Sequence, residues 1–252
     1  MKFSFVIICC VVDFIYFVET SNLSQFSNDF SIISKAVSEF ISHAYFINTP
    51  KVNICSAPIN DDQKLATDDL INEVVMQSES VFQIEQYSFL NASNEKRFHN
   101  VILISNYASF RQIYNCLLAD NFAYQGYFLF VLIDYYKEQV VEMHQVIRDL
   151  WEIYIVNVNI LMKNKVENVL DMMTYHPFYP KKCGQAYPVY INQFKNSKFE
   201  KPGKFFVDTL ENMNQCPLRV ASFNIAPFMM IKYTNDSFIL DGIDGFLLTG
   251  NN

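Results

Sequence analysis

Two unbroken apolar runs constrain the fold of this chain more than any other feature. Val101–Ile104 reads Val-Ile-Leu-Ile, and Phe128–Ile133 reads Phe-Leu-Phe-Val-Leu-Ile. Continuous runs of this kind are typical of strands that are covered on both faces, whereas a strand with one wet face alternates apolar and polar residues. Neither run approaches the roughly 20 apolar residues that a membrane-spanning helix needs. The sequence therefore predicts two strands buried in the middle of a sheet.

Segments with helical spacing alternate with these strands. Four segments place apolar residues three and four positions apart: Phe26–Ala44, Asp61–Val75, Phe110–Leu118 and Val140–Trp151. Ser109 and Gln112 have the spacing of a capping box for the third helix. Weaker strand patterns occur at Val52–Cys55, Val81–Tyr87 and Ile153–Ile160. This alternation predicts an α/β fold, a parallel sheet with flanking helices and right-handed crossovers.

The first 20 residues have the composition of a secretory signal. Met1-Lys2 precedes an apolar run from Phe3 to Val18, and polar residues return at Glu19. Asp13 interrupts the run, which disfavours a stable membrane span. We expect residues 1–20 to direct export. A buried N-terminal helix or strand is the alternative.

Composition and charge exclude several functions. The formal net charge is −7 and no basic stripe occurs, so we expect no nucleic-acid partner. With six glycines the chain has neither a G-x-G-x-x-G motif nor a P-loop, and we expect no nucleotide cofactor. Hydrophobic residues make up 51% and charged residues 18%, which is enough apolar material for a sizeable core.

The chain beyond the signal keeps an even number of cysteines. These are Cys55, Cys116, Cys183 and Cys216, and four cysteines allow three pairings. Two disulfides are expected in an oxidising compartment. Asn22, Asn91 and Asn235 each begin an Asn-x-Ser triplet and are candidate glycosylation sites.

No constellation of residues supports catalysis or metal binding. The histidines His43, His99, His144 and His176 lack metal-ligand spacing, and no G-x-S-x-G motif is present. His144 falls on an apolar helix face, which favours a core or boundary role. Cys183 with His176 is the one conceivable nucleophile pair, and its Pro-rich turn disfavours it. We therefore expect no enzyme, no cofactor and no metal.

Acidic clusters have ordinary structural explanations. Asp61, Asp62, Asp68 and Asp69 lack the spacing and glycine of a calcium loop and fit a solvated helix start. Asp241 and Asp244 fit turn geometry. Tyr135 and Tyr136 follow the second buried strand, where ligands bind in open α/β sheets, so they are candidate pocket residues, with core packing as the alternative for neighbouring aromatics.

The composition changes after Tyr175. Residues 176–184 are rich in turn residues, residues 191–215 look like a polar connector, and a new strand begins at Leu218. We therefore expect an α/β domain over residues 21–190, a connector over 191–215 and the start of a second domain at 216–252.

The last segment carries a family resemblance. Asn214–Ala221, then Ala226–Met229, then Asp241–Leu248 follow the order of a strand, a Pro-aromatic turn and a Gly-x-x-Gly-like return. This order resembles the start of the ligand-binding domain of insect-type divergent ionotropic receptors, relatives of the ionotropic glutamate receptors. The preceding α/β region resembles the shortened amino-terminal domain of those receptors, a periplasmic-binding-protein-like lobe.

The resemblance implies a function without catalysis. It implies the extracellular amino-terminal region of a chemosensory ligand-gated cation channel, with a small-molecule ligand, co-receptor subunits and membrane attachment through a channel region beyond Asn252. Ile225 stands where glutamate receptors often place an acid, which makes glutamate a doubtful ligand. The alternative is a stand-alone secreted small-ligand-binding protein.

Within this resemblance a Cys183–Cys216 bridge would tie the two domains together. Such a bridge would stabilise the fold by about 3–4 kcal/mol in the chain-entropy model. Cys55 and Cys116 would form the second pair, or either would be a small buried hydrophobe.

Overall fold

The computed structural model describes most of the chain and divides it into two units. The units are Met1–Gln215 and Cys216–Asn252. The described residues are 30–45, 51–57, 61–78, 81–86, 97–118, 122–133, 139–164, 168–203, 205–206, 212–217, 230–233 and 238–241.

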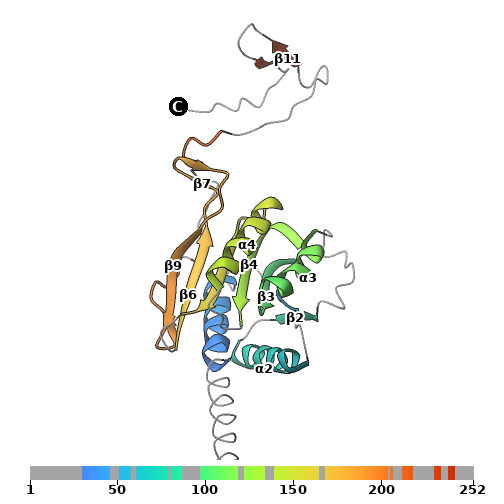
Figure 1. Cartoon of the computed structure of the whole chain (residues 1–252), viewed down its shortest axis with the longest axis vertical. Helices are drawn as coiled ribbons and strands as arrows, with labels where there is room; N and C mark the ends of the chain where they lie inside the picture. The colour runs from blue at the N-terminus through green and yellow to red at the C-terminus, as the bar shows by residue number, and fades with distance from the viewer. Residues whose placement is uncertain are drawn as a thin grey trace, which may run out of the picture. The chain divides into compact units, whose positions relative to one another are not determined.

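The first unit is built on an eight-stranded sheet (Figure 1). Its strands follow the spatial order β10-β9-β6-β5-β4-β3-β1-β2. Their bounds are β1 Lys51–Ser56, β2 Val81–Gln86, β3 Arg97–Ile104, β4 Phe122–Leu132, β5 Val158–Lys163, β6 Val169–Tyr175, β9 Pro188–Lys195 and β10 Lys198–Phe199. Five neighbouring strands, in the spatial order β2-β1-β3-β4-β5, pair in parallel. β6, β9 and β10 continue the sheet with antiparallel pairing.

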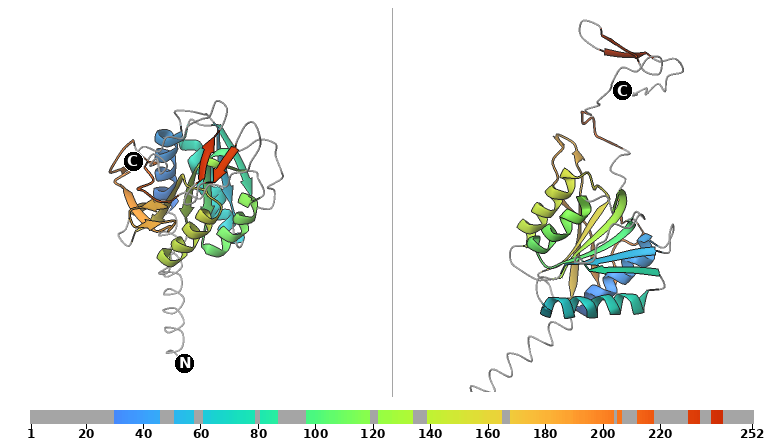
Figure 2. Two further views of the ribbon diagram at one scale, coloured as in Figure 1. Left: turned by 90° about the horizontal axis from the view of Figure 1, so that it is seen from above. Right: turned by 90° about the vertical axis from the view of Figure 1, so that its right-hand side faces the viewer.

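Helices cover both faces of the sheet (Figure 2). The first helix spans residues 30–40 and continues as the π-helical turn η1. The others are α2, α3 and α4, and the bounds are η1 Ile41–Tyr45, α2 Asp61–Gln77, α3 Tyr107–Leu118 and α4 Gln139–Glu152. One core lies between the sheet and α3 and α4, and a second lies between the sheet and the first helix with α2. The predicted α/β fold is confirmed.

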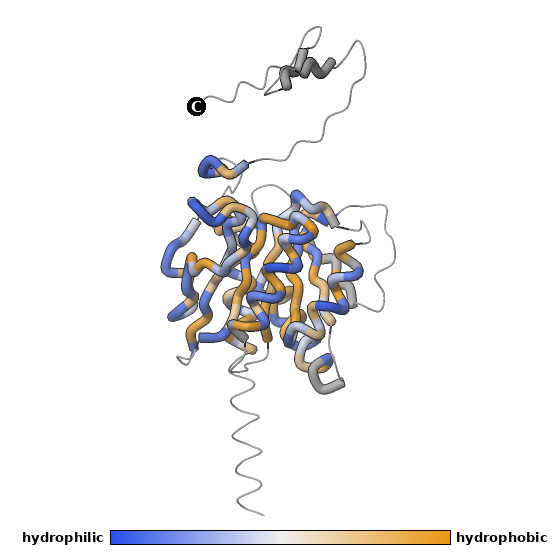
Figure 3. The backbone as a smooth tube through the Cα atoms, turned by 45° about the horizontal axis from the view of Figure 1, so that its top comes forward, coloured by the Kyte–Doolittle hydropathy of each residue, from blue (hydrophilic) through white to orange (hydrophobic). Residues whose placement is uncertain are grey.

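The continuous apolar runs are explained by these two cores. Ile102 and Ile104 face the core beneath α3 and α4, whereas Val101 and Leu103 face the core beneath the first helix and α2. Successive strand residues point to opposite faces, so a strand in the middle of a three-layer fold needs apolar residues at every position. Figure 3 shows the strands in the middle of the sheet mostly in the hydrophobic colour.

β9, β10 and Phe205 belong to the sheet and its core, although we expected residues 191–215 to form a connector. β9 pairs with β6 along its length, and Phe194, Phe199 and Phe205 are buried. The polar residues that suggested a connector are satisfied within the fold. Asn192 donates to the Lys201 carbonyl at 2.8 Å, and Gln193 donates to the Asp171 carboxylate at 2.9 Å.

The expected strand at Ile153–Ile160 begins later, at Val158. The apolar residues before it end α4 in a Schellman motif. Tyr154 has a positive φ of 59° and its amide donates to the Trp151 carbonyl, while the Ile155 amide donates to the Leu150 carbonyl. Because a tyrosine occupies the position that usually holds glycine, the sequence did not indicate that the helix ends here.

The cap of α3 lies three residues earlier than expected. The Ser109 amide donates to Asn106 Oδ1 at 3.0 Å, and the Asn106 amide donates to Ser109 Oγ at 3.1 Å. Asn106 is therefore the cap residue, and Ser109 closes the box from the third helical position. The predicted pairing of Ser109 with Gln112 was wrong.

Two small hairpins stand apart from the main sheet. β7 Phe178–Tyr179 pairs with β8 Lys182–Cys183 in the turn-rich segment, and β11 Met230–Tyr233 pairs with β12 Phe238–Asp241 in the second unit. Leu218–Phe223, Pro227 and Asp244, which contribute to the family resemblance, lie outside the described residues. Among the described residues, no helix has the length and apolar character to cross a bilayer.

Candidate functional site

The strand order of the described sheet reverses between β1 and β3, and we call the carboxyl ends of these two strands the candidate crevice. From β1 the chain crosses to β2 on one side, and then returns past β1 to β3 on the other side. Loops on either side of such a reversal diverge, and ligands of open α/β sheets bind there. The order β2-β1-β3-β4-β5 thus places the candidate site where β1 and β3 end.

Serine residues end both of these strands. Ser56 is the last residue of β1, and Ser105 directly follows β3. Each is about 1% exposed, and neither hydroxyl has a hydrogen-bond partner among the described residues. Leaving a buried hydroxyl without a partner costs about 1–3 kcal/mol, so such groups require an explanation.

The two hydroxyls belong to the same face of the sheet. Ile54 and Leu103, two residues before them, both pack in the core beneath the first helix and α2. Because side chains alternate along a strand, Ser56 and Ser105 are directed to that face as well. β1 and β3 are neighbours, with Ser56 paired to Leu103. The crevice therefore has two adjacent neutral hydroxyls on one of its sides.

The start of α3 borders the crevice but is closed by its own side chains. Ser109 Oγ accepts from the amides of Ser105 at 2.9 Å and Asn106 at 3.1 Å, and Asn106 Oδ1 accepts from the Ser109 amide. These bonds satisfy amides that would otherwise attract an anion. The crevice is thus better suited to an uncharged hydrogen-bonding group than to a carboxylate.

A charged network joins α3 and α4 next to this edge. The Asp149 carboxylate accepts from the Tyr107 hydroxyl at 2.6 Å and from Arg111 at 2.9 Å, and Arg148 lies 3.5 Å away. Asp149 is buried while both arginines are partly exposed. Burial raises the pKa of Tyr107, and its hydrogen bond to the carboxylate raises it further. The network fixes the first turn of α3 relative to α4.

The opposite, amino edge of the sheet carries an aromatic cluster with a structural role. The Tyr45 hydroxyl donates to the Asn100 carbonyl at 3.0 Å, and Asn53 donates to the His99 carbonyl at 3.1 Å. The His99 ring lies between the rings of Tyr45 and Tyr127, with centroids 4.8 and 5.7 Å away. Burial lowers the pKa of His99, so this imidazole is neutral in the folded protein at neutral pH.

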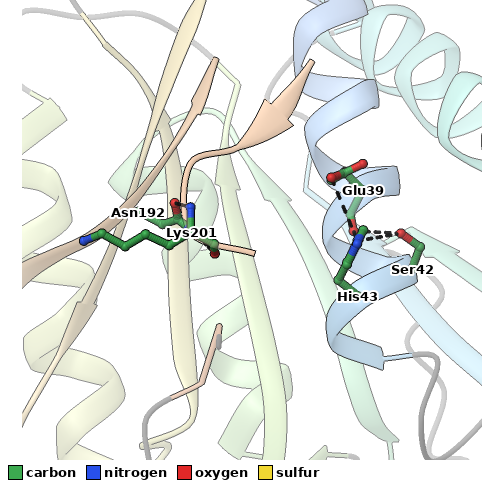
Figure 4. A network of polar contacts seen from close by, with 5 residues as sticks. All are labelled: Glu39, Ser42, His43, Asn192 and Lys201. Atoms are coloured by element: carbon green, nitrogen blue, oxygen red, sulfur yellow. Dashed lines mark hydrogen bonds and ion pairs between the residues drawn. The ribbon is translucent and has the colours of Figure 1, made fainter. Parts of the chain in front are cut away.

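Figure 4 shows two polar networks, one on the exposed side of the first helix and one around the buried Asn192 side chain. On the first helix, His43 Nδ1 is 2.9 Å from the Glu39 carbonyl and 3.1 Å from Ser42 Oγ. On the sheet, Asn192 exchanges hydrogen bonds with the Lys201 backbone. Both networks hold local backbone in place. Ser42 Oγ donates to the Glu39 carbonyl at 2.8 Å, and His43 Nδ1 lies against the same carbonyl, so this pair serves its own helical turn.

The expected site residues have different outcomes. Tyr135, Tyr136, Asn22, Asn91 and Asn235 lie outside the described residues, so their roles stay predictions. His144, expected on the packed side of its helix, is exposed. Among the described residues no group of histidine, cysteine and acidic side chains could hold a metal ion.

The cysteines have outcomes of their own. Cys183 and Cys216 are both disulfide-bonded, which removes the thiol that a Cys183–His176 nucleophile pair would need. Cys55 is buried in β1, and the side chain of Cys116 lies outside the described residues. In the structure Cys55 is a thiol, which favours the alternative of a small buried hydrophobe over a Cys55–Cys116 disulfide.

Serine residues were missed as site candidates. The available signal was a serine directly after each apolar run, in Ile54-Cys55-Ser56 and in Ile104-Ser105. That signal cannot be interpreted from the sequence alone. The strand order shows that β1 and β3 are neighbours at the point where the order of the sheet reverses.

The mixed sheet with helices on both faces is the fold of an α/β lobe of the periplasmic-binding-protein type. The family model described as "Putative ionotropic receptor, ligand binding domain" matches residues 24–212. The chain belongs to this ionotropic receptor ligand-binding domain family. No curated protein and no solved structure matches the chain. The match ends before the division at Cys216, so the family description applies to the region that we expected to be the amino-terminal domain.

Proposed function

We propose that this chain is the extracellular ligand-capturing region of a chemosensory ionotropic receptor of the insect type. The family match over residues 24–212 is the observation that carries the proposal. In this role the region binds a small molecule and acts on a channel formed with co-receptor subunits.

The proposed ligand site is the crevice where β1 and β3 end. The reversal of strand order and the two buried hydroxyls of Ser56 and Ser105 support this location. A ligand with an uncharged hydrogen-bonding group would satisfy both hydroxyls. The closed start of α3 disfavours ligands that depend on a carboxylate, which agrees with the doubt about glutamate.

Ser56→Ala and Ser105→Ala test the site through two opposite effects. Each change removes a buried hydroxyl without a partner, so the ligand-free protein should become more stable by about 1 kcal/mol or stay unchanged. Each should also weaken ligand binding about tenfold, because the ligand loses a buried hydrogen bond. Thermal shift with a panel of odorant-like alcohols, amides, amines and acids measures both.

Ser38→Ala is the matched control. Ser38 is a buried serine of the first helix, and its hydroxyl also has no partner among the described residues. This variant should gain similar stability and keep full ligand response. Ligands that bind the two site variants as tightly as they bind the unaltered chain would contradict the location. Failure of every member of a broad panel to shift the full chain would contradict ligand capture.

A further inference from the structure

The two margins of the sheet carry opposite charge: basic residues gather at the β9–β10 margin and acidic residues at the margin with β2 and α2. Residues 176–203, which include β9 and β10, contain five lysines and one acidic residue in a chain whose net charge is −7. Lys195, Lys198 and Lys201 are all exposed. β10 is the edge strand on this side, and β9 lies next to it (Figure 1). This margin is basic although the protein as a whole is acidic.

Tyrosine rings lie among these lysines. Tyr187 and Tyr190 are 48% and 46% exposed. The ammonium group of Lys182 lies 5.0 Å from the Tyr187 ring centre, and that of Lys201 lies 5.9 Å from the Tyr190 ring centre. Aromatic bodies next to flexible cations combine apolar area with charge, as protein-binding surfaces do. We call Tyr187, Tyr190, Lys195, Lys198 and Lys201 the β9–β10 surface.

The arrangement of two of these lysines does not stabilise the fold. Lys195 and Lys198 are directly paired across β9 and β10, and like charges in that position are destabilising. Asn196 and Ser197 between them both have positive φ, 53° and 61°, so the tight turn fixes this pairing. A bound group of negative charge would relieve the repulsion.

The other margin of the sheet is acidic. Residues 51–86, which include β1, α2 and the edge strand β2, contain seven acidic residues and two lysines. Leu65, Asp69, Glu73 and Met76 follow one another at helical spacing, and all four are exposed. Leu65 is 67% and Met76 is 88% exposed. We call these four residues the α2 outer face.

The two surfaces are complementary in charge, chemistry and size. The α2 outer face, from Leu65 to Met76, covers an axial rise of about 17 Å, and the eight residues of β9 cover about 25 Å, which is long enough to receive it. The Asp69 carboxylate matches the lysines, whereas the Glu73 carboxylate is held by Ser34. The two apolar ends, Leu65 and Met76, match the exposed tyrosine rings. Complementary charges of this kind steer association and fix its register.

We propose that the α2 outer face of one copy of this chain docks on the β9–β10 surface of a second copy. The contact joins two different surfaces at opposite margins of the sheet, so it is heterologous and can repeat head to tail. The acidic surface that binds the lysines thus belongs to a second copy of the chain. The proposal does not depend on the ligand site.

Charge reversal in the full chain tests this pairing. Lys195→Glu with Lys198→Glu makes both surfaces acidic, and Asp69→Lys with Asn72→Lys makes both basic. Glu73 is kept because its carboxylate accepts a hydrogen bond from Ser34 at 2.6 Å. Sedimentation velocity should show concentration-dependent association of the unaltered chain that weakens with salt, and at least about tenfold weaker association of each double variant.

Mixing the two double variants is the decisive measurement. Each variant repels itself but offers the other a surface of opposite charge, so the mixture should associate again. Asn115→Lys and Asn115→Asp on the exposed side of α3 shift net charge in both directions away from these surfaces and should associate like the unaltered chain.

Several results would overturn the proposal. One is an unaltered chain that stays monomeric at low salt and high concentration, and another is a mixture that stays monomeric. If the lysines merely protect an edge strand from pairing, as edge lysines often do, Lys195→Glu with Lys198→Glu would leave self-association unchanged. Circular dichroism and thermal melting confirm that each variant is folded.

Discussion

Single residues explain why polar groups survive inside this fold. Asn53, Asn100 and Tyr45 are buried and each donates a hydrogen bond to backbone or side-chain oxygens. Ser56 and Ser105 are buried as deeply, and their hydroxyls have no partner among the described residues. Ser38 and the Oδ1 atom of Asn53 are also buried without a partner among the described residues. It is therefore the position of Ser56 and Ser105 where β1 and β3 end, and not the missing partner alone, that fits them to the proposed ligand crevice.

His99 makes stability depend on pH. Burial between two tyrosine rings lowers its pKa below the ordinary value of 6.5, so below that pH the unfolded chain binds a proton that the folded chain resists. Stability is therefore complete above about pH 7 and falls as pH drops through the unfolded value. Urea unfolding from about pH 7.5 to 5 measures the slope.

His99→Phe keeps an aromatic ring in place and removes the proton site. This variant should show a weaker loss of stability in acid than the unaltered chain. Burial also lowers the pKa of His176, which adds a slope of the same sign. His176→Gln should remove that second part. An unchanged slope in both variants would contradict this explanation.

At the scale of elements, Tyr154 ends α4 in a conformation that suits glycine. Its φ of 59° costs about 1 kcal/mol for a residue with a Cβ atom. Tyr154→Gly should raise the free energy of unfolding by about 0.5–1 kcal/mol, because the backbone strain disappears. Thermal melting with calorimetry measures the gain.

Asn168→Gly is a matched control for this change. Asn168 has nearly the same φ of 58°, but asparagine tolerates the left-handed region better than tyrosine. Its gain should therefore be smaller. The interpretation fails if Tyr154→Gly lowers the melting temperature. Such a loss would mean that the contact between the Tyr154 and Trp151 rings, 5.8 Å apart, matters more than the strain.

Elements in the parallel half of the sheet were predictable and those in the antiparallel half were not. Val101–Ile104 is buried on both faces of the sheet, and its four consecutive apolar residues indicate this in the sequence. β9 contains Asn192 and Gln193, whose polarity suggested a connector. These residues are satisfied by Lys201 and Asp171, which only the folded sheet brings next to them.

At the scale of the whole molecule, a covalent bond at the division of the chain is a testable feature. Cys183 and Cys216 are both disulfide-bonded, and we propose that they pair with each other. Trp151 Nε1 donates to the Gly184 carbonyl at 3.0 Å, and the Asn214 side chain donates to the Phe178 carbonyl at 2.8 Å. Asn214, two residues before Cys216, is thus hydrogen-bonded to the β7–β8 hairpin, which contains Cys183.

Cys183→Ser with Cys216→Ser should lower the free energy of unfolding by about 3–4 kcal/mol, because the unfolded chain regains the freedom of the loop. Denaturant unfolding of the full chain measures this loss. Non-reducing peptide mapping is the independent check. A peptide that links Cys183 to any cysteine other than Cys216 would contradict the pairing.

The sequence by itself determined the class of fold, because apolar periodicity records which residues must avoid water regardless of what they contact. It also excluded nucleotide motifs and metal spacing, which depend on residue type and interval alone. Only the tertiary structure decided the order of the strands, the inclusion of β9 and β10 in the sheet, and the meeting of Ser56 with Ser105 at one edge. Those features depend on pairings between residues far apart in the chain, and local sequence carries no record of which distant segment satisfies a given polar group.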